Sequence, residues 1–177
     1  MEKKTMVGLI AIIAVVAVLI SAGAVYKEED FSTAELTDEN VINAVKDSLG
    51  REGDLQLDVF IYGLPPYPEG GECVKITRPC KGSWNYEEMI KSFARDSVDA
   101  LEVLFSNPQV NKVILIQENW YTKVQVTFSR KTADRINWDN LAQIVLTDYT
   151  KFFYVADSCR VEGPDKYRIY DLLGKTR

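Results

Sequence analysis

The apolar segment from Met6 to Tyr26 constrains this 177-residue chain more than any other feature. It contains no Asp, Glu, Lys or Arg, and its 21 residues would span about 31 Å as a helix, close to the hydrocarbon thickness of a bilayer. An unpaired backbone amide in lipid costs several kcal/mol, so a single spanning segment must be helical. We therefore predict a transmembrane helix at residues 6–26 and name the lipid bilayer as its partner.

The charges that flank this segment predict its orientation. Lys3 and Lys4 precede it, whereas the residues on its other side are mainly acidic. Basic residues favour the cytoplasmic side, which makes residues 1–5 cytoplasmic and places the rest of the chain outside, as in a single-pass membrane protein. Ala22-Gly23-Ala24 also has the small-x-small form that signal peptidase accepts, so a domain secreted after cleavage at Ala24 is the alternative. The hydrophobic length favours an uncleaved signal-anchor.

The remainder of the chain has the size of one domain. Residues 27–36 are acidic and small, which indicates a spacer, and residues 37–177 are long enough to enclose one hydrophobic core. We predict that 37–177 form a single extracytoplasmic α+β domain.

Hydrophobic periodicity gives the order of its elements. Helical spacing follows a cap at Thr37 or Asp38 and ends at Gly50, and a long helix is expected from Ser83 or Asn85 to Asn107. Strands are expected at 55–62, 110–117 and 121–130, a small ribbon at 73–80, a proline-rich loop at 64–71, two helical turns after 130, and a weak last element at 167–173. The pattern at 150–156 fits either a buried strand or a helical turn. This order is typical of a compact α/β sandwich, and the ferredoxin-like split βαβ fold with an extra N-terminal helix is our expectation.

Composition excludes several functions. The chain has no histidine, which rules out Ser-His-Asp and Cys-His hydrolases and removes the usual zinc ligand. Its net charge is −5 and it has no basic run, so nucleic-acid binding is disfavoured. No glycine-rich phosphate loop is present, and we expect no cofactor, no metal and no catalytic residue of a known motif.

The chain has three cysteines, Cys73, Cys80 and Cys159. Thiols outside the cytoplasm tend to pair, and Cys73 with Cys80 is the pair nearest in sequence. We therefore predict a disulfide between them. Pairing of Cys159 with either of the two is the alternative.

Four aromatic residues fall at predicted loops or turns: Tyr67, Trp84, Trp120 and Tyr121. Amphipathic rings in such positions can form a recognition surface for a protein or glycan. The alternative is that Trp84 and Trp120 cover the edges of the core.

These observations leave three functional hypotheses. The first is a non-catalytic binding or assembly module that is anchored in the membrane and makes contact through loop aromatics. The second is an extracytoplasmic enzyme that works without histidine and uses carboxylates such as Asp139 or Asp148. The third is an accessory subunit of a membrane complex, since small residues form a stripe along the predicted anchor.

Overall fold

A computed structural model describes residues 30–50, 55–64, 70–79 and 85–174. Contacts divide the chain into a unit up to Asp30 and a unit from Phe31 to Arg177, and all the described helices and strands belong to the second unit. The predicted transmembrane segment at 6–26 lies outside the described residues. Within the described ranges, no helix is both long enough and apolar enough to cross a membrane.

The described part is an α+β domain. Its strands are β1 (Asp58–Gly63), β2 (Glu72–Pro79), β3 (Val110–Glu118), β4 (Lys123–Ser129) and β5 (Ser158–Glu162). Its helices are α2 (Asp38–Ser48), α3 (Tyr86–Ser106), α4 (Arg130–Ala133), α5 (Trp138–Thr147), α6 (Thr150–Val155) and α7 (Lys166–Leu172). The α+β class predicted from the sequence is therefore confirmed.

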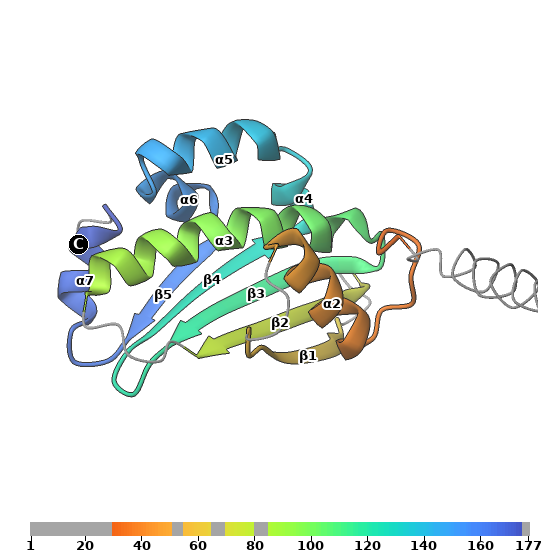
Figure 1. The fold of residues 1–177 in the computed structure, drawn as a ribbon, viewed down its shortest axis with the longest axis horizontal. Coiled ribbons are helices and arrows are strands. Elements are labelled where there is room, and N and C mark those ends of the chain that lie inside the picture. The colour runs from red at the N-terminus through yellow and green to blue at the C-terminus, as the bar shows by residue number, and fades with distance from the viewer. Residues whose placement is uncertain (1–29, 51–54, 65–69, 80–84, 175–177) are drawn as a thin grey trace, which may run out of the picture. The chain divides into compact units, whose positions relative to one another are not determined.

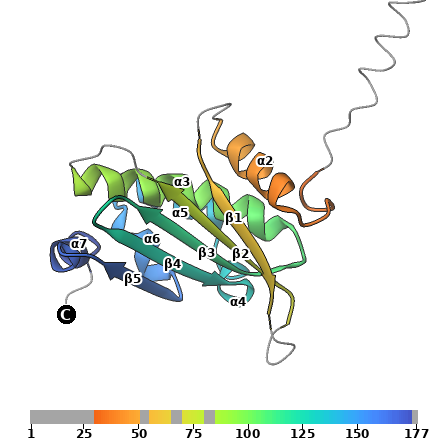
Figure 2. The same ribbon diagram turned by 90° about the horizontal axis from the view of Figure 1, so that it is seen from below.

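The strands form one mixed sheet in the order β1-β2-β3-β4-β5. Only β2 and β3 are parallel, and α3 connects them, while the other neighbouring pairs are antiparallel. Helices α2, α3, α5 and α6 lie over one face of the sheet, and the described helices leave the other face open (Figures 1 and 2).

The ferredoxin-like expectation is wrong in its sheet order. A split βαβ unit places another strand between its two parallel strands, whereas β2 and β3 are direct neighbours from Glu72 beside Val110 to Pro79 beside Glu118. The sequence interpretation treated the β2 residues as a small ribbon beneath a loop. In the structure they form an inner strand of the sheet, and Val74 and Ile76 on this strand are buried in the core.

The structure decides an alternative that the sequence left open, and it differs from the sequence interpretation in one strand and two helix caps. Residues 150–155, which fitted either a strand or a helix, form α6, and the last strand, β5, begins at Ser158. The caps of α4 and α5 are Ser129 and Asn137 rather than the predicted Thr132 and Asp139 or Asn140.

The long helix α3 follows its prediction closely. Asn85 caps it by accepting hydrogen bonds from the backbone N–H groups of Glu87 and Glu88. Its buried side packs on the sheet, and its centre contacts an aromatic cluster whose members are at most 4% exposed: Phe93, Phe128, Phe152 and Phe153. This cluster forms the middle of the core.

The domain begins before the predicted boundary. Phe31 and Ala34 are buried, and their carbonyl oxygens accept hydrogen bonds of 2.9 and 3.0 Å from the side-chain amide of Asn107. The predicted spacer therefore ends at Asp30, since the buried Asn107 attaches residues 31–36 to the end of α3. Thr37 then caps α2 as the sequence predicts.

Candidate recognition site at the β3–β4 hairpin

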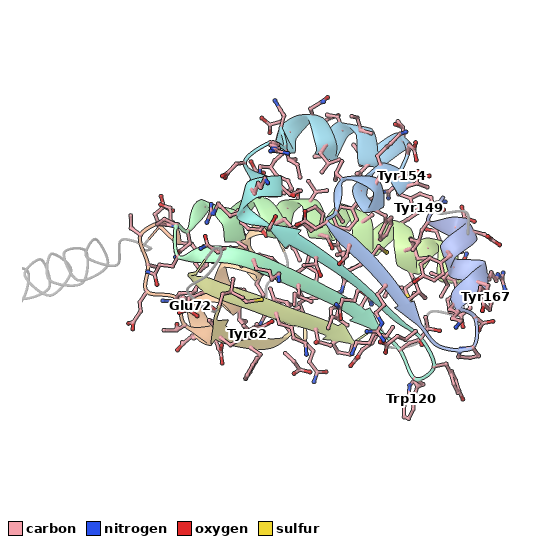
Figure 3. All side chains as sticks on the ribbon, turned by 180° about the vertical axis from the view of Figure 1, so that it is seen from behind. Tyr62, Glu72, Trp120, Tyr149, Tyr154 and Tyr167 are labelled. Atoms are coloured by element: carbon pink, nitrogen blue, oxygen red, sulfur yellow. The ribbon has the colours of Figure 1, made fainter. Side chains whose placement is uncertain are left out.

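The tip of the β3–β4 hairpin carries the two most exposed large hydrophobic side chains of the described residues. Trp120 is 92% exposed and Tyr121 is 72% exposed. Figure 3 shows Trp120 projecting from the end of the hairpin, away from the sheet. The position in a turn was predicted from the sequence, but Trp120 does not cover a core edge, so that alternative is wrong for this residue.

Asn119 fixes the conformation of the tip. Its side-chain oxygen accepts hydrogen bonds of 3.0 and 2.8 Å from the N–H groups of Tyr121 and Thr122, and its own N–H donates to the Thr122 carbonyl at 2.9 Å. Asx turns of this kind hold a loop without help from a partner. The two aromatic side chains are therefore displayed on an ordered backbone.

The turn before α7 packs directly against the tip. A Cβ on Gly163, whose φ is +122°, would lie 2.2 Å from the Tyr121 carbonyl oxygen and 3.1 Å from the Thr122 Cα. Only glycine allows this approach, because it has no Cβ and accepts a positive φ. Gly163 therefore allows the turn before α7 to pack against the backbone of the hairpin tip.

A second contact joins the same turn to α3. The Tyr86 hydroxyl donates a 2.7 Å hydrogen bond to the carboxylate of Asp165, which raises the pKa of Tyr86 because the bond favours the protonated phenol. The guanidinium of Arg168 lies 5.8 Å from the Tyr86 ring centroid. These contacts position the start of α7 beside the hairpin.

Two of the four predicted recognition residues, Tyr67 and Trp84, lie outside the described residues. One that the sequence interpretation did not include is Tyr167, which is 52% exposed on α7, four residues after Gly163. Figure 3 places Tyr167 toward the same end of the domain as Trp120. No pattern in the sequence indicates this, because the packing of Gly163 against the hairpin tip is what brings the turn before α7 to this end of the domain.

The open face of the sheet carries a separate aromatic pair on β1. Phe60 is 62% exposed, and its ring centroid lies 5.7 Å from that of Tyr62. A hydrogen bond between Tyr62 and Cys73, on the neighbouring strand β2, raises the pKa of Tyr62 to about 12. This pair belongs to an edge strand and is not part of the hairpin site.

Cys73, one member of the predicted Cys73–Cys80 disulfide, lies on β2. Cys73 is free and fully buried, and Cys80 lies outside the described residues. From residue 73 the chain runs extended to Pro79. Cys159 lies on β5.

We expect Cys73 to resist alkylation in the native protein and to react only after unfolding. Burial raises the pKa of its thiol, so that both the access of a reagent and the fraction of reactive thiolate are reduced. Mass spectrometry of peptides after iodoacetamide treatment, with and without urea, measures this, and the half-buried Cys159 serves as the internal comparison. Equal native labelling of the two cysteines would contradict the burial of Cys73.

The described residues do not bring together the acids that the enzyme hypothesis requires. Asp139 is in the first turn of α5 and Asp148 follows its last turn, about 13 Å apart along the helix axis. Asp148 accepts hydrogen bonds from the N–H and hydroxyl of Thr150, which lower its pKa and give it a structural role at α6. No group of three or more possible metal-ligating side chains occurs in the described ranges.

Hollows among the described residues include the following two. A small one of about 30 Å³ lies between α2, α3 and the sheet, and the ion pair of Arg78 with Asp96 lies beside it. An open one of about 440 Å³ is lined by Asn111, Arg130, Lys131, Asp134 and Arg135. Each contains a single acid, so neither provides a pair of carboxylates for acid–base chemistry.

Comparisons of the chain with protein-family models, with curated proteins and with solved structures each found no match.

Proposed function

We propose that this chain is a single-pass membrane protein whose extracytoplasmic domain binds a protein or glycan partner through the tip of the β3–β4 hairpin. The observation that carries the proposal is the near-complete exposure of Trp120 and Tyr121 on a turn that Asn119 holds in one conformation. The anchor rests on the apolar sequence of residues 6–26.

Exposed tryptophan and tyrosine on an ordered turn are suited to binding. Both side chains offer a large contact area and few rotatable bonds, so little side-chain entropy is lost when a partner covers them. Trp and Tyr are also enriched among the residues that dominate binding energies at interfaces. Since Asn119 and Gly163 already fix the backbone, the domain does not have to order this loop on binding.

The hairpin lies at the far end of β3 from the start of the domain. Phe31 is bonded to Asn107, just before β3 begins at Val110, and Trp120 comes shortly after the last residue of β3, Glu118. Nine extended residues separate these ends by about 26 Å. A partner at the tip would therefore meet the domain well away from the point where the predicted anchor joins it.

Site-specific photo-crosslinking in cell membranes tests the proposal. With the full chain carrying a photoreactive amino acid at position 120, we expect a discrete crosslinked partner in membranes washed with alkaline carbonate. The control position is Leu146, which is 56% exposed on α5, away from the hairpin, and it should give no such product. Crosslinking to an integral membrane protein would identify the partner as a subunit of a membrane complex.

Two results would contradict the proposal. Recovery of the full-length chain from the soluble fraction after the carbonate wash would contradict the predicted membrane anchor. The same product from positions 120 and 146, or none from position 120, would remove the tip as the binding site. The double variant Trp120→Ala/Tyr121→Ala should lose the partner at least tenfold while it unfolds at the same temperature as wild type, because neither side chain is buried.

A further inference from the structure

The open hollow beside α4 is basic in a chain that is otherwise acidic. Three cations and one acid line it, Arg130, Lys131 and Arg135 against Asp134, together with the amide of Asn111. The whole chain has a net charge of −5, so this concentration of positive charge runs against its overall balance. A basic hollow in an acidic protein favours an anionic ligand of compact size.

Arg130 supplies a fixed positive charge at the base of the hollow. Its guanidinium donates to the carbonyl oxygens of Phe105 and Asn107, and to that of Val110 at 2.6 Å, and it lies 5.2 Å from the Phe105 ring centroid. The bonds to Phe105 and Asn107 satisfy carbonyls at the end of α3 that no helix bond can reach, and the third bond is to the first residue of β3. Arg130 is therefore a scaffold that contributes charge but has few donors left for a ligand.

Lys131 and Arg135 are the groups available to bind. Both are exposed, and neither takes part in any ion pair found in the described part of the chain. A lysine ammonium and an arginine guanidinium together match the oxygens of a phosphate group, the arginine through paired hydrogen bonds.

Hydrogen bonds place the hollow beside the start of the domain. Arg130 bonds to the backbone carbonyl of Asn107, whose side chain bonds to the carbonyls of Phe31 and Ala34. Only residues 27–30 separate Phe31 from the predicted transmembrane helix, a reach of about 17 Å when fully extended. With the proposed anchor in place, a tether of this length keeps the hollow within a short distance of the bilayer surface.

We propose that Lys131 and Arg135 bind the headgroup phosphate of an anionic lipid, which orients the domain on the membrane. The inference rests on the proposed anchor. The tether itself carries Glu28, Glu29 and Asp30 and cannot supply this attraction. Each basic residue close to an anionic surface strengthens association by roughly fivefold. The two basic side chains together therefore oppose the repulsion between the acidic tether and the anionic lipid surface.

Amine labelling of the full chain in nanodiscs tests this inference. We expect a water-soluble acetylating reagent to modify Lys131 several-fold more slowly in nanodiscs containing phosphatidylglycerol than in nanodiscs of phosphatidylcholine alone. Lys151, on α6, has a side chain that is 54% exposed and should react equally in both. The variant Arg135→Gln should lose much of the protection at Lys131, whereas Arg95→Gln, at an exposed site on α3, should not.

Three outcomes overturn the inference. Equal rates at Lys131 in the two lipids would exclude headgroup binding. Equal slowing at Lys131 and Lys151 would indicate a general effect of the anionic surface. Protection by inorganic phosphate in phosphatidylcholine nanodiscs, as strong as that by phosphatidylglycerol, would identify a site for free phosphate. Failure of the chain to enter nanodiscs at all would count against the anchor instead, so the two proposals fail in distinguishable ways.

Discussion

Replacing Phe152 by alanine is expected to lower the free energy of unfolding by about 3–5 kcal/mol, the range for removing a fully buried aromatic side chain. Phe152 is 0% exposed. Its ring centroid lies 5.1, 5.5 and 6.2 Å from those of Phe153, Phe128 and Phe93, which come from α6, β4 and α3. The substitution would leave a cavity where these three elements meet, and they cannot close it without moving together.

Phe60 provides a control with the same chemical change. It is 62% exposed on the edge strand β1, where its ring pairs with that of Tyr62. Phe60→Ala should therefore cost less than about 1 kcal/mol. Urea unfolding of the full chain in detergent, followed by circular dichroism, measures both variants. Similar losses for the two would show that the cluster around Phe152 is not the centre of the core.

The elements that the sequence predicted well are those whose patterns are set locally. The stripe of α3 continues for 21 residues and begins at a capping residue, Asn85, so both its period and its start are visible in the sequence. In β4, the buried Val124, Val126 and Phe128 alternate with half-buried polar residues, as expected for a strand with one open face. Both α3 and β4 can therefore be predicted without knowing which segments they pack against.

The elements that were missed depend on their neighbours. β2 resembles a short ribbon because Lys75 and Arg78 interrupt its apolar residues. In the fold, an ion pair with Asp96 of α3 stabilises the charge of Arg78 on this strand. β5 has only one buried residue, Val161, and its sequence carries almost no strand signal. Its pairing with β4 creates the strand, and that pairing was not predictable from periodicity.

The candidate site also has a part that the sequence predicts and a part that depends on contacts made in the fold. Trp120 and Tyr121 were predicted as turn aromatics because they lie between the apolar segment at 110–117 and the alternating positions that start at Val124. Their support by Gly163 and their proximity to α7 come from contacts across about forty residues of sequence, which a single sequence does not encode in any visible pattern. The basic hollow was likewise not predictable, since Asn111 and Arg135 are brought together only by the fold.

Replacing Asn107 by alanine is expected to detach residues 31–36 from the domain while the sheet and α3 stay folded. The side chain is 0% exposed and donates to the carbonyls of Phe31 and Ala34. Each buried carbonyl left without a donor costs about 1–3 kcal/mol. Water can satisfy both carbonyls if the segment leaves the surface, at the expense of the burial of Phe31, which is worth about 2–3 kcal/mol. Detachment therefore limits the total loss.

The detachment should end at α2, because Thr37 caps that helix by accepting a hydrogen bond from the Asn40 N–H. Limited proteolysis of the full chain should then show at least tenfold faster cleavage within residues 31–36 for Asn107→Ala, whereas Asn43→Ala, at an exposed site on α2, should match wild type. Cleavage at the wild-type rate in Asn107→Ala would contradict the role of this side chain. The tether would also grow from residues 27–30 to 27–36, a reach of about 38 Å, so the lipid protection of Lys131 should weaken in the same variant even though Lys131 and Arg135 are unchanged.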